Sequence, residues 1–178
     1  MSSRLTKFLQ DYVIERVDQE LCPLKLGFYA KEEKPFKGLK FDVYAYSKKR
    51  GIMLIWEIEI GNCPDGCITN VRKVRRILNF KWLPYVHMFH IFSPFCDDYE
   101  GPCKKVAKNL QKKNELRFSY KQFSIPISYD EFDEIYKAFE DSKKRAEQDY
   151  GRRLRVHMGK IVRNSIHMFV SEDQRSGN

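Results

Sequence analysis

One hairpin-like stretch, KFDVYAYSKKRGIMLIWEIEIGN, does most to limit what this chain can fold into. Two runs rich in β-forming residues, 40–47 and 52–60, flank the turn-like sequence KKRG. The second run is too apolar for an exposed sheet edge, yet Glu57 and Glu59 interrupt it, and Asp42 lies in the first run. The sequence therefore predicts a buried sheet that carries three acidic side chains.

Side chains alternate along a strand, which places Glu57 and Glu59 on one face together with Met53 and Ile55. The rise of the strand separates the two glutamates by about 6.6 Å. A four-residue turn between the two runs puts Asp42 opposite Glu57, and a two-residue turn puts it opposite Glu59. In either register the three carboxylates share a face and lie within about 5–8 Å of one another.

Clustered carboxylates repel one another and lose hydration on burial, so each is driven to protonate unless a cation compensates its charge. Mg²⁺, or Mn²⁺ in its place, binds such oxygens and needs only one or two carboxylates beside water and phosphate. Asp42, Glu57 and Glu59 are therefore the predicted metal ligands. The alternative is a solvated polar face, but Met53 and Ile55 on the same face argue against full exposure.

Helical and strand-like segments alternate along the rest of the chain. They predict an α/β fold with a central mixed sheet of about five strands and helices on both faces. We expect loops at 61–67 and 93–103, and a single domain, 1–178, with a less regular basic extension from about residue 150. The predicted elements are a helix over 5–21, strands over 26–33, 40–47 and 52–60, a helix over 69–80, a strand over 85–92, a helix over 104–116, a strand over 117–125 and a helix over 128–148.

The order of these elements and the positions of the acids resemble the PD-(D/E)XK, or restriction-endonuclease-like, nuclease superfamily. That family has an α-β-β-β-α-β core, with an Asp at the start of the second strand and an acid-x-Lys pair on the third. Asp42, Glu57 and Glu59 stand at the matching positions, and the resemblance is best from Arg4 to about Phe95. It implies an endonuclease that uses Mg²⁺ or Mn²⁺ to hydrolyse phosphodiester bonds.

The chain departs from the family pattern in two places. Phe41 precedes Asp42 where the family usually has Pro, and Glu59 stands where it usually has Lys. Lys73, on the following helix, is the predicted replacement for that lysine, and a second metal ion held by Glu59 is the alternative. Many relatives also use a Glu on the first helix. Glu20, beside the apolar stripe, is the candidate here, Glu15 is a second one, and a solvated helix face is the alternative for both.

The chain carries 33 Lys and Arg residues against 24 Asp and Glu, a net charge of +9, which suits a polyanionic partner. No apolar run approaches the ~20 residues of a membrane span. The N-terminus also lacks the apolar core of a signal peptide. We therefore expect an intracellular protein that binds nucleic acid, with DNA favoured, and no membrane.

Two groups of arginines are the predicted phosphate contacts, and a solvated helix face is the alternative for each. Phosphate contacts carry no base information, so recognition of backbone or shape is expected. The groups are Arg72, Arg75 and Arg76 after the acidic strand, and Arg152, Arg153 and Arg155 near the C-terminus.

Five cysteines are many for a reducing cytosol. Cys63 and Cys67 flank one short stretch, Cys96 and Cys103 flank another, and the family's parallel third and fourth strands would bring the two stretches together. Four cysteines there could bind zinc, form disulfides or remain free thiols. The Cys-x3-Cys and Cys-x6-Cys spacings are not standard for zinc, and all three states stay open.

These features together predict a metal-dependent nuclease, and a homodimer fits because many relatives cut two strands. The alternative is a nuclease-like module that has lost catalysis and only binds nucleic acid, since the lysine of the third strand is missing. Metal binding through the carboxylates would distinguish the enzyme from the binding module.

Overall fold

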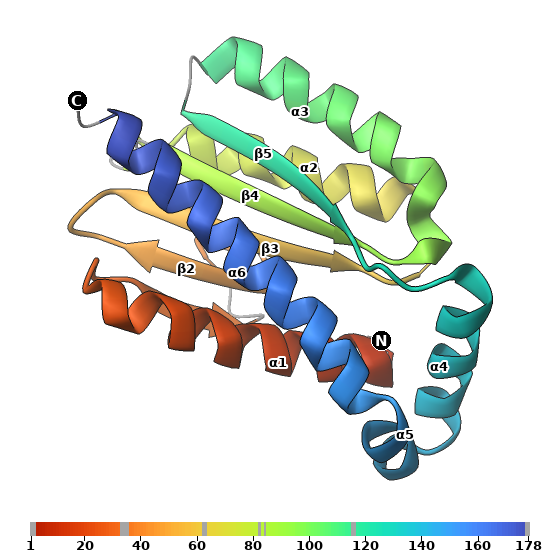
Figure 1. The fold of residues 1–178 in the computed structure, drawn as a ribbon. Helices are drawn as coiled ribbons and strands as arrows, with labels where there is room; N and C mark the ends of the chain where they lie inside the picture. The colour runs from red at the N-terminus through yellow and green to blue at the C-terminus, as the bar shows by residue number, and fades with distance from the viewer. Residues whose placement is uncertain are drawn as a thin grey trace.

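The computed structural model describes residues 3–32, 36–61, 64–81, 83, 85–114 and 117–176. β1, β2 and β3 are antiparallel neighbours, whereas β3, β4 and β5 run parallel. The predicted α/β class with a mixed sheet flanked by helices is therefore confirmed. The strands lie side by side in chain order (Figure 1): β1 (Tyr29–Glu32), β2 (Val43–Ser47), β3 (Ile52–Glu59), β4 (Tyr85–Phe92) and β5 (Phe118–Ser124).

Helices cover both faces of the sheet (Figure 1). One face packs against α1, α4, α5 and α6, and the other packs against α2 and α3, so the protein has two separate apolar cores. Short 3₁₀ helices, η1 (Cys22–Leu24) and η2 (Pro94–Tyr99), follow α1 and β4. The α-helices are α1 (Arg4–Leu21), α2 (Pro64–Leu78), α3 (Glu100–Asn114), α4 (Tyr129–Asp141), α5 (Lys143–Asp149) and α6 (Gly151–Ser176).

Strand β3 supplies side chains to both cores. Leu54, Trp56 and Ile58 enter the core with α1 and α6, whereas Met53 and Ile55 enter the core with α2 and α3. This is the alternation that the sequence predicts. The two glutamates of β3 therefore belong to the face that α2 and α3 cover.

The β2–β3 hairpin has the four-residue turn, because Ser47 pairs with Ile52. Gly51 ends this turn with a φ of 64°, in the left-handed region that glycine adopts at little cost. The two-residue turn considered from the sequence is therefore excluded. Continuing the observed register by one residue beyond β2 sets Asp42 opposite Glu57.

The C-terminal segment is not the less regular extension that the sequence suggested. It forms one continuous helix, α6, whose apolar side chains recur every three or four residues and enter the core shared with α1. Ser165 accepts a hydrogen bond from Trp56 Nε1 at 2.8 Å, which ties α6 to the centre of β3. Basic and histidine residues between the apolar positions obscure the period in the sequence. The buried apolar positions are Leu154, Met158, Ile161, Val162, Ile166 and Phe169.

Other element boundaries also differ from the prediction. Helix α2 begins at Pro64, inside the expected loop 61–67, and η2 begins at Pro94, inside the expected loop 93–103. Proline suits the first turn of a helix because its missing N–H has no partner there. The helix predicted over 128–148 is divided at Ser142 into α4 and α5.

Candidate active site

Asp42 and Glu57 form a carboxyl pair where β2 begins and β3 ends. Asp42 Oδ2 accepts a hydrogen bond from the backbone N–H of Ile58 at 2.7 Å, and Oδ1 accepts one from Gln10 Nε2 at 2.6 Å. The Asp42 and Glu57 side chains are hydrogen-bonded to each other. The structure thus brings together two of the three acids that the sequence selected.

Glu57 is almost completely buried, with 2% of its surface exposed. Burial raises its pKa well above the usual 4.5, and the neighbouring Asp42 charge raises it further. Burial also raises the pKa of Asp42, although the Ile58 N–H opposes that shift. Glu57 is therefore the carboxyl of the pair that binds a proton more readily when no cation is present.

Two oxygens beside this pair lack a partner. Among the described residues, neither Glu57 Oε1 nor Gln10 Oε1 has a hydrogen-bond partner, and both atoms are buried. Gln10 itself is 1% exposed. Leaving a buried acceptor unsatisfied costs about 1–3 kcal/mol, so each of these two oxygens could accept a hydrogen bond or coordinate a cation.

Sequence reasoning missed Gln10 and selected Glu20 as the first-helix residue of the site. Glu20 Oε1 instead bonds Arg16 at 2.6 Å and Arg163 at 3.3 Å, which links α1 to α6. The signal for Gln10 was its place three residues before Val13 in the apolar stripe of the helix. A polar side chain in such a stripe either forms hydrogen bonds with other buried groups or belongs to a functional site.

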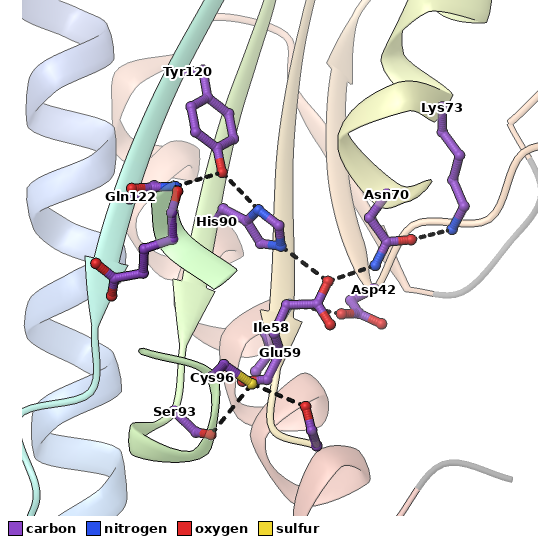
Figure 2. A network of polar contacts seen from close by, with 12 residues as sticks. Asp42, Ile58, Glu59, Asn70, Lys73, His90, Ser93, Cys96, Tyr120 and Gln122 are labelled. Atoms are coloured by element: carbon purple, nitrogen blue, oxygen red, sulfur yellow. Dashed lines mark hydrogen bonds and ion pairs between the residues drawn. The ribbon is translucent and has the colours of Figure 1, made fainter. Parts of the chain in front are cut away.

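Glu59 lies two residues after Glu57 on β3 and so shares its face. Figure 2 shows its partners, Asn70 and His90. Its Oε1 accepts hydrogen bonds from Asn70 Nδ2 at 2.7 Å and His90 Nε2 at 2.9 Å. Burial raises the pKa of Glu59, but the bonds from His90 and Asn70 outweigh burial and hold the pKa below 4.5. Glu59 is therefore ionised under conditions in which Glu57 is protonated.

Lys73 extends from α2 toward the same strand ends. Its Nζ donates to Asn70 Oδ1 at 2.5 Å and to the backbone oxygen of Lys40 at 3.2 Å, and it lies 5.9 Å from the centre of the Phe41 ring. Its positive charge partly offsets the raised pKa of Glu57. The structure therefore brings Lys73 to the acidic residues, where the sequence placed it.

The two arginine groups lie on opposite faces of the sheet. Arg72, Arg75 and Arg76 are exposed on α2, the helix that carries Lys73. The C-terminal arginines lie on α6, which covers the other face (Figure 1). There, Arg153 pairs with Glu131 and Arg155 lies 5.1 Å from the centre of the Phe8 ring, while Arg152 is exposed. Only the first group lies on the helix that flanks the site.

Cys67, Cys96 and Cys103 gather between α2, η2 and α3 and are fully buried. They are free cysteines, so no disulfide links the cysteines that the structure describes, and Cys63 lies outside the described residues. Cys96 Sγ donates to the Gly61 backbone oxygen at 3.0 Å. Cys67 contacts both other thiols, and its hydrogen bond to Cys103 lowers the pKa of Cys103.

No group of three or more His, Cys, Asp or Glu side chains within the described ranges is arranged to hold a metal ion. In the same ranges, no helix has the length and apolar character needed to cross a membrane. Comparison with protein-family models, with curated proteins and with solved structures gave no match. The function must therefore be inferred from the geometry of the site.

Proposed function

We propose that this protein is a metal-dependent nuclease that hydrolyses phosphodiester bonds, with DNA as the favoured substrate. The observation that carries the proposal is the buried Asp42–Glu57 pair with its unpartnered oxygens on Glu57 and Gln10. A buried acid pair without a compensating cation destabilises the fold. Selection for a function of that pair explains why the chain retains it.

The atoms present suit a hard divalent cation. Asp42, the protonatable Glu57 and the free Oε1 of Gln10 offer only oxygen ligands, which Mg²⁺ and Mn²⁺ prefer. Mg²⁺ commonly takes only one or two carboxylates, so a convergent group of three is not required. When bound, the ion would polarise a phosphate and lower the pKa of the attacking water.

The arrangement of elements supports the resemblance to the PD-(D/E)XK superfamily. The chain begins in the order α1, β1, β2, β3, α2, β4, which is the α-β-β-β-α-β order of that family. Asp42 immediately precedes β2, and Glu57 and Glu59 occupy the end of β3. Asp42 and Glu57 stand where the family carries its acids, and Glu59 stands where it usually has Lys.

The remaining residues have roles that follow from their charge and place. Glu59 is ionised, as its lowered pKa indicates, and lies outside the set that would hold the ion, so it can accept a proton from water. Lys73 places a positive charge beside the acids, where it can stabilise negative charge on phosphate. Arg72, Arg75 and Arg76 are exposed on the same helix and can grip the nucleic-acid backbone.

One observation favours a second candidate, a nuclease-like module that binds nucleic acid without cutting it. Glu59 occupies the place of the family's lysine, and His90 and Asn70 hold it by two hydrogen bonds. The same contacts are expected in a site that has lost catalysis and kept a stable polar network. The module would bind nucleic acid but would need no divalent ion.

The test is incubation of the protein with plasmid, linear, single-stranded and branched DNA and with RNA, in Mg²⁺, Mn²⁺ or EDTA. We expect cleavage of at least one DNA form with a divalent ion and none with EDTA. Glu134→Gln, an exposed acid on α4, should cut normally, whereas Glu57→Gln should not. Binding without cleavage in every condition would overturn the nuclease and favour the module.

A further inference from the structure

A row of hydrogen bonds crosses the sheet beside the acidic pair (Figure 2). It begins at Tyr120 on β5, passes through His90 on β4 and Glu59 on β3, and ends at Asn70 and Lys73 on α2. Tyr120 Oη lies 2.8 Å from His90 Nδ1, and His90 Nε2 lies 2.9 Å from Glu59 Oε1. Asn70 Nδ2 lies 2.7 Å from Glu59 Oε1, and Lys73 Nζ lies 2.5 Å from Asn70 Oδ1.

Two groups set the direction of these bonds: the amide of Gln122 at one end and the carboxylate of Glu59 in the middle. Gln122 Nε2 donates to the backbone oxygen of Glu100 at 2.7 Å and to Tyr120 Oη at 3.1 Å, which fixes the orientation of the amide. Burial raises the pKa of Tyr120, so the phenol keeps its proton. His90 Nε2 faces the carboxylate of Glu59, which only accepts, so Nε2 carries a proton. Tyr120 Oη, which accepts from Gln122, pairs with His90 Nδ1.

The same logic passes through Glu59 to Lys73. His90 Nε2–H donates to Glu59 Oε1, and an ionised carboxylate can only accept. Asn70 must therefore turn its NH₂ group toward Glu59, which leaves Oδ1 to face Lys73. Each bond from His90 to Lys73 has one allowed direction, and the last of them fixes the ammonium group of Lys73.

We propose that His90, Asn70 and Tyr120 are positioning residues that act through Glu59 to hold Lys73 beside the Asp42–Glu57 pair, an inference that rests on the proposed nuclease function. Glu59, which stands where the family has its lysine, serves as the anchor for a lysine supplied by α2. His90 is fully buried, so the packing around it limits the movement of the side chain at the centre of the row.

The tautomer of His90 is the first test, because it needs no activity. The chain has four histidines, and ¹⁵N labelling of histidine with a His90→Gln variant for assignment resolves the ring of His90. We expect a proton on Nε2, the nitrogen that faces Glu59. In Tyr120→Phe, which removes only the hydroxyl, the ¹⁵N shift of Nδ1 should change because that nitrogen loses its partner. A wild-type ring whose Nε2 carries no proton would overturn the proposal.

Kinetics provide the second test. His90→Leu and Asn70→Leu should lower kcat by about 10- to 100-fold, the usual effect of residues that support a ligand or catalytic group, with KM changed by less than about twofold. His90→Gln should restore most of the rate because its amide can donate from nearly the same position as Nε2. If His90 acts through Lys73, His90→Leu should add no further loss to Lys73→Met. Independent, multiplicative losses would overturn the proposal.

The two proposals fail in different ways. Wild-type protein that cuts no substrate would refute the nuclease, and the ¹⁵N spectra would still decide whether the row of bonds exists. Wild-type protein that cuts, together with a fully active His90→Leu variant, would refute the positioning role and leave the nuclease standing. Tyr120→Phe gives a nearly isosteric variant if His90→Leu proves unfolded by circular dichroism.

Discussion

Glu57 and His90 lie directly opposite each other on the parallel strands β3 and β4, yet His90 bonds to Glu59 and not to Glu57. The nearest imidazole therefore does not compensate the most deeply buried acid of the site. This pairing shifts the pKa values of the two glutamates in opposite directions, since Glu59 receives the donors and burial raises the pKa of Glu57. Such separation of two carboxyl groups is a common property of catalytic sites.

The first prediction concerns stability and pH. The pKa of Glu57 in the folded protein lies above 4.5, its ordinary value in the unfolded chain. At a pH between the two pKa values, the native protein therefore binds more protons than the unfolded chain. In EDTA, its contribution to stability is therefore fully present below about pH 4.5 and is lost as the pH rises through the folded pKa. Each unit of difference between the folded-state and unfolded-state pKa changes the free energy of unfolding by about 1.4 kcal/mol. Glu57→Gln should flatten this dependence, as measured by urea unfolding from pH 4.5 to 8.

Comparison with the variant is needed because Glu59, whose pKa is lowered, changes stability in the opposite direction with pH. Adding Mn²⁺ to the wild type at pH 8 should recover the lost stability, and adding it to Glu57→Gln should not. If the free energy of unfolding varies with pH in the same way in the wild type and in Glu57→Gln, the burial of Glu57 does not affect stability.

The second prediction separates binding from cleavage. Asp42→Ala and Glu57→Ala should lose cleavage, because each removes a carboxylate that would hold the metal ion. Binding of nucleic acid should remain or become slightly tighter, since negative charge near the phosphates is removed. Fluorescence anisotropy in EDTA and single-turnover cleavage in Mg²⁺ measure the two properties. Full cleavage by both variants would remove the pair from the mechanism.

The third prediction concerns the exposed arginines of α2. Replacing two of Arg72, Arg75 and Arg76 by Gln should weaken binding of every duplex sequence about equally. Each lost phosphate contact should reduce the slope of log K against log salt by about 0.9. Lys160→Gln, an exposed charge on α6 across the sheet, is the matched control and should leave the slope unchanged. Equal effects from both helices would indicate nonspecific attraction.

The fourth prediction concerns the thiols. Because the described cysteines form no disulfide, a reducing agent should leave Tm unchanged. Cys67, Cys96 and Cys103 are fully buried, so a thiol reagent should modify them only when the chain unfolds, whereas the exposed Cys22 should react at once. Mass spectrometry of the native protein after brief labelling measures this difference. A fall of several degrees in Tm on reduction would contradict the free-thiol state.

The strand that holds the site could be predicted from sequence because alternation and register are local properties. Met53 and Ile55 marked the buried face, and the turn length limited Asp42 to positions opposite Glu57 or Glu59. Lys73 was also within reach of prediction, since the helix after β3 must return along the sheet.

The residues that were missed depend on contacts between distant segments. Gln10 meets Asp42 across 32 residues, and His90 meets Glu59 across 31. Nothing in the sequence around His90 points to a glutamate on the neighbouring strand. Helix α6 was missed because its apolar stripe is interrupted by charged residues and is defined only by its packing against α1.

The packing of α6 against α1 also determines when this protein can complete its fold. The first and last helices share one core, so the core on that face must wait until the C-terminal residues leave the ribosome. The opposite face needs only β2 to β5, α2 and α3, which are synthesised earlier. Contacts across so much sequence slow folding, and we expect the nascent chain to expose the apolar surface of Leu54, Trp56 and Ile58 until the last helix docks.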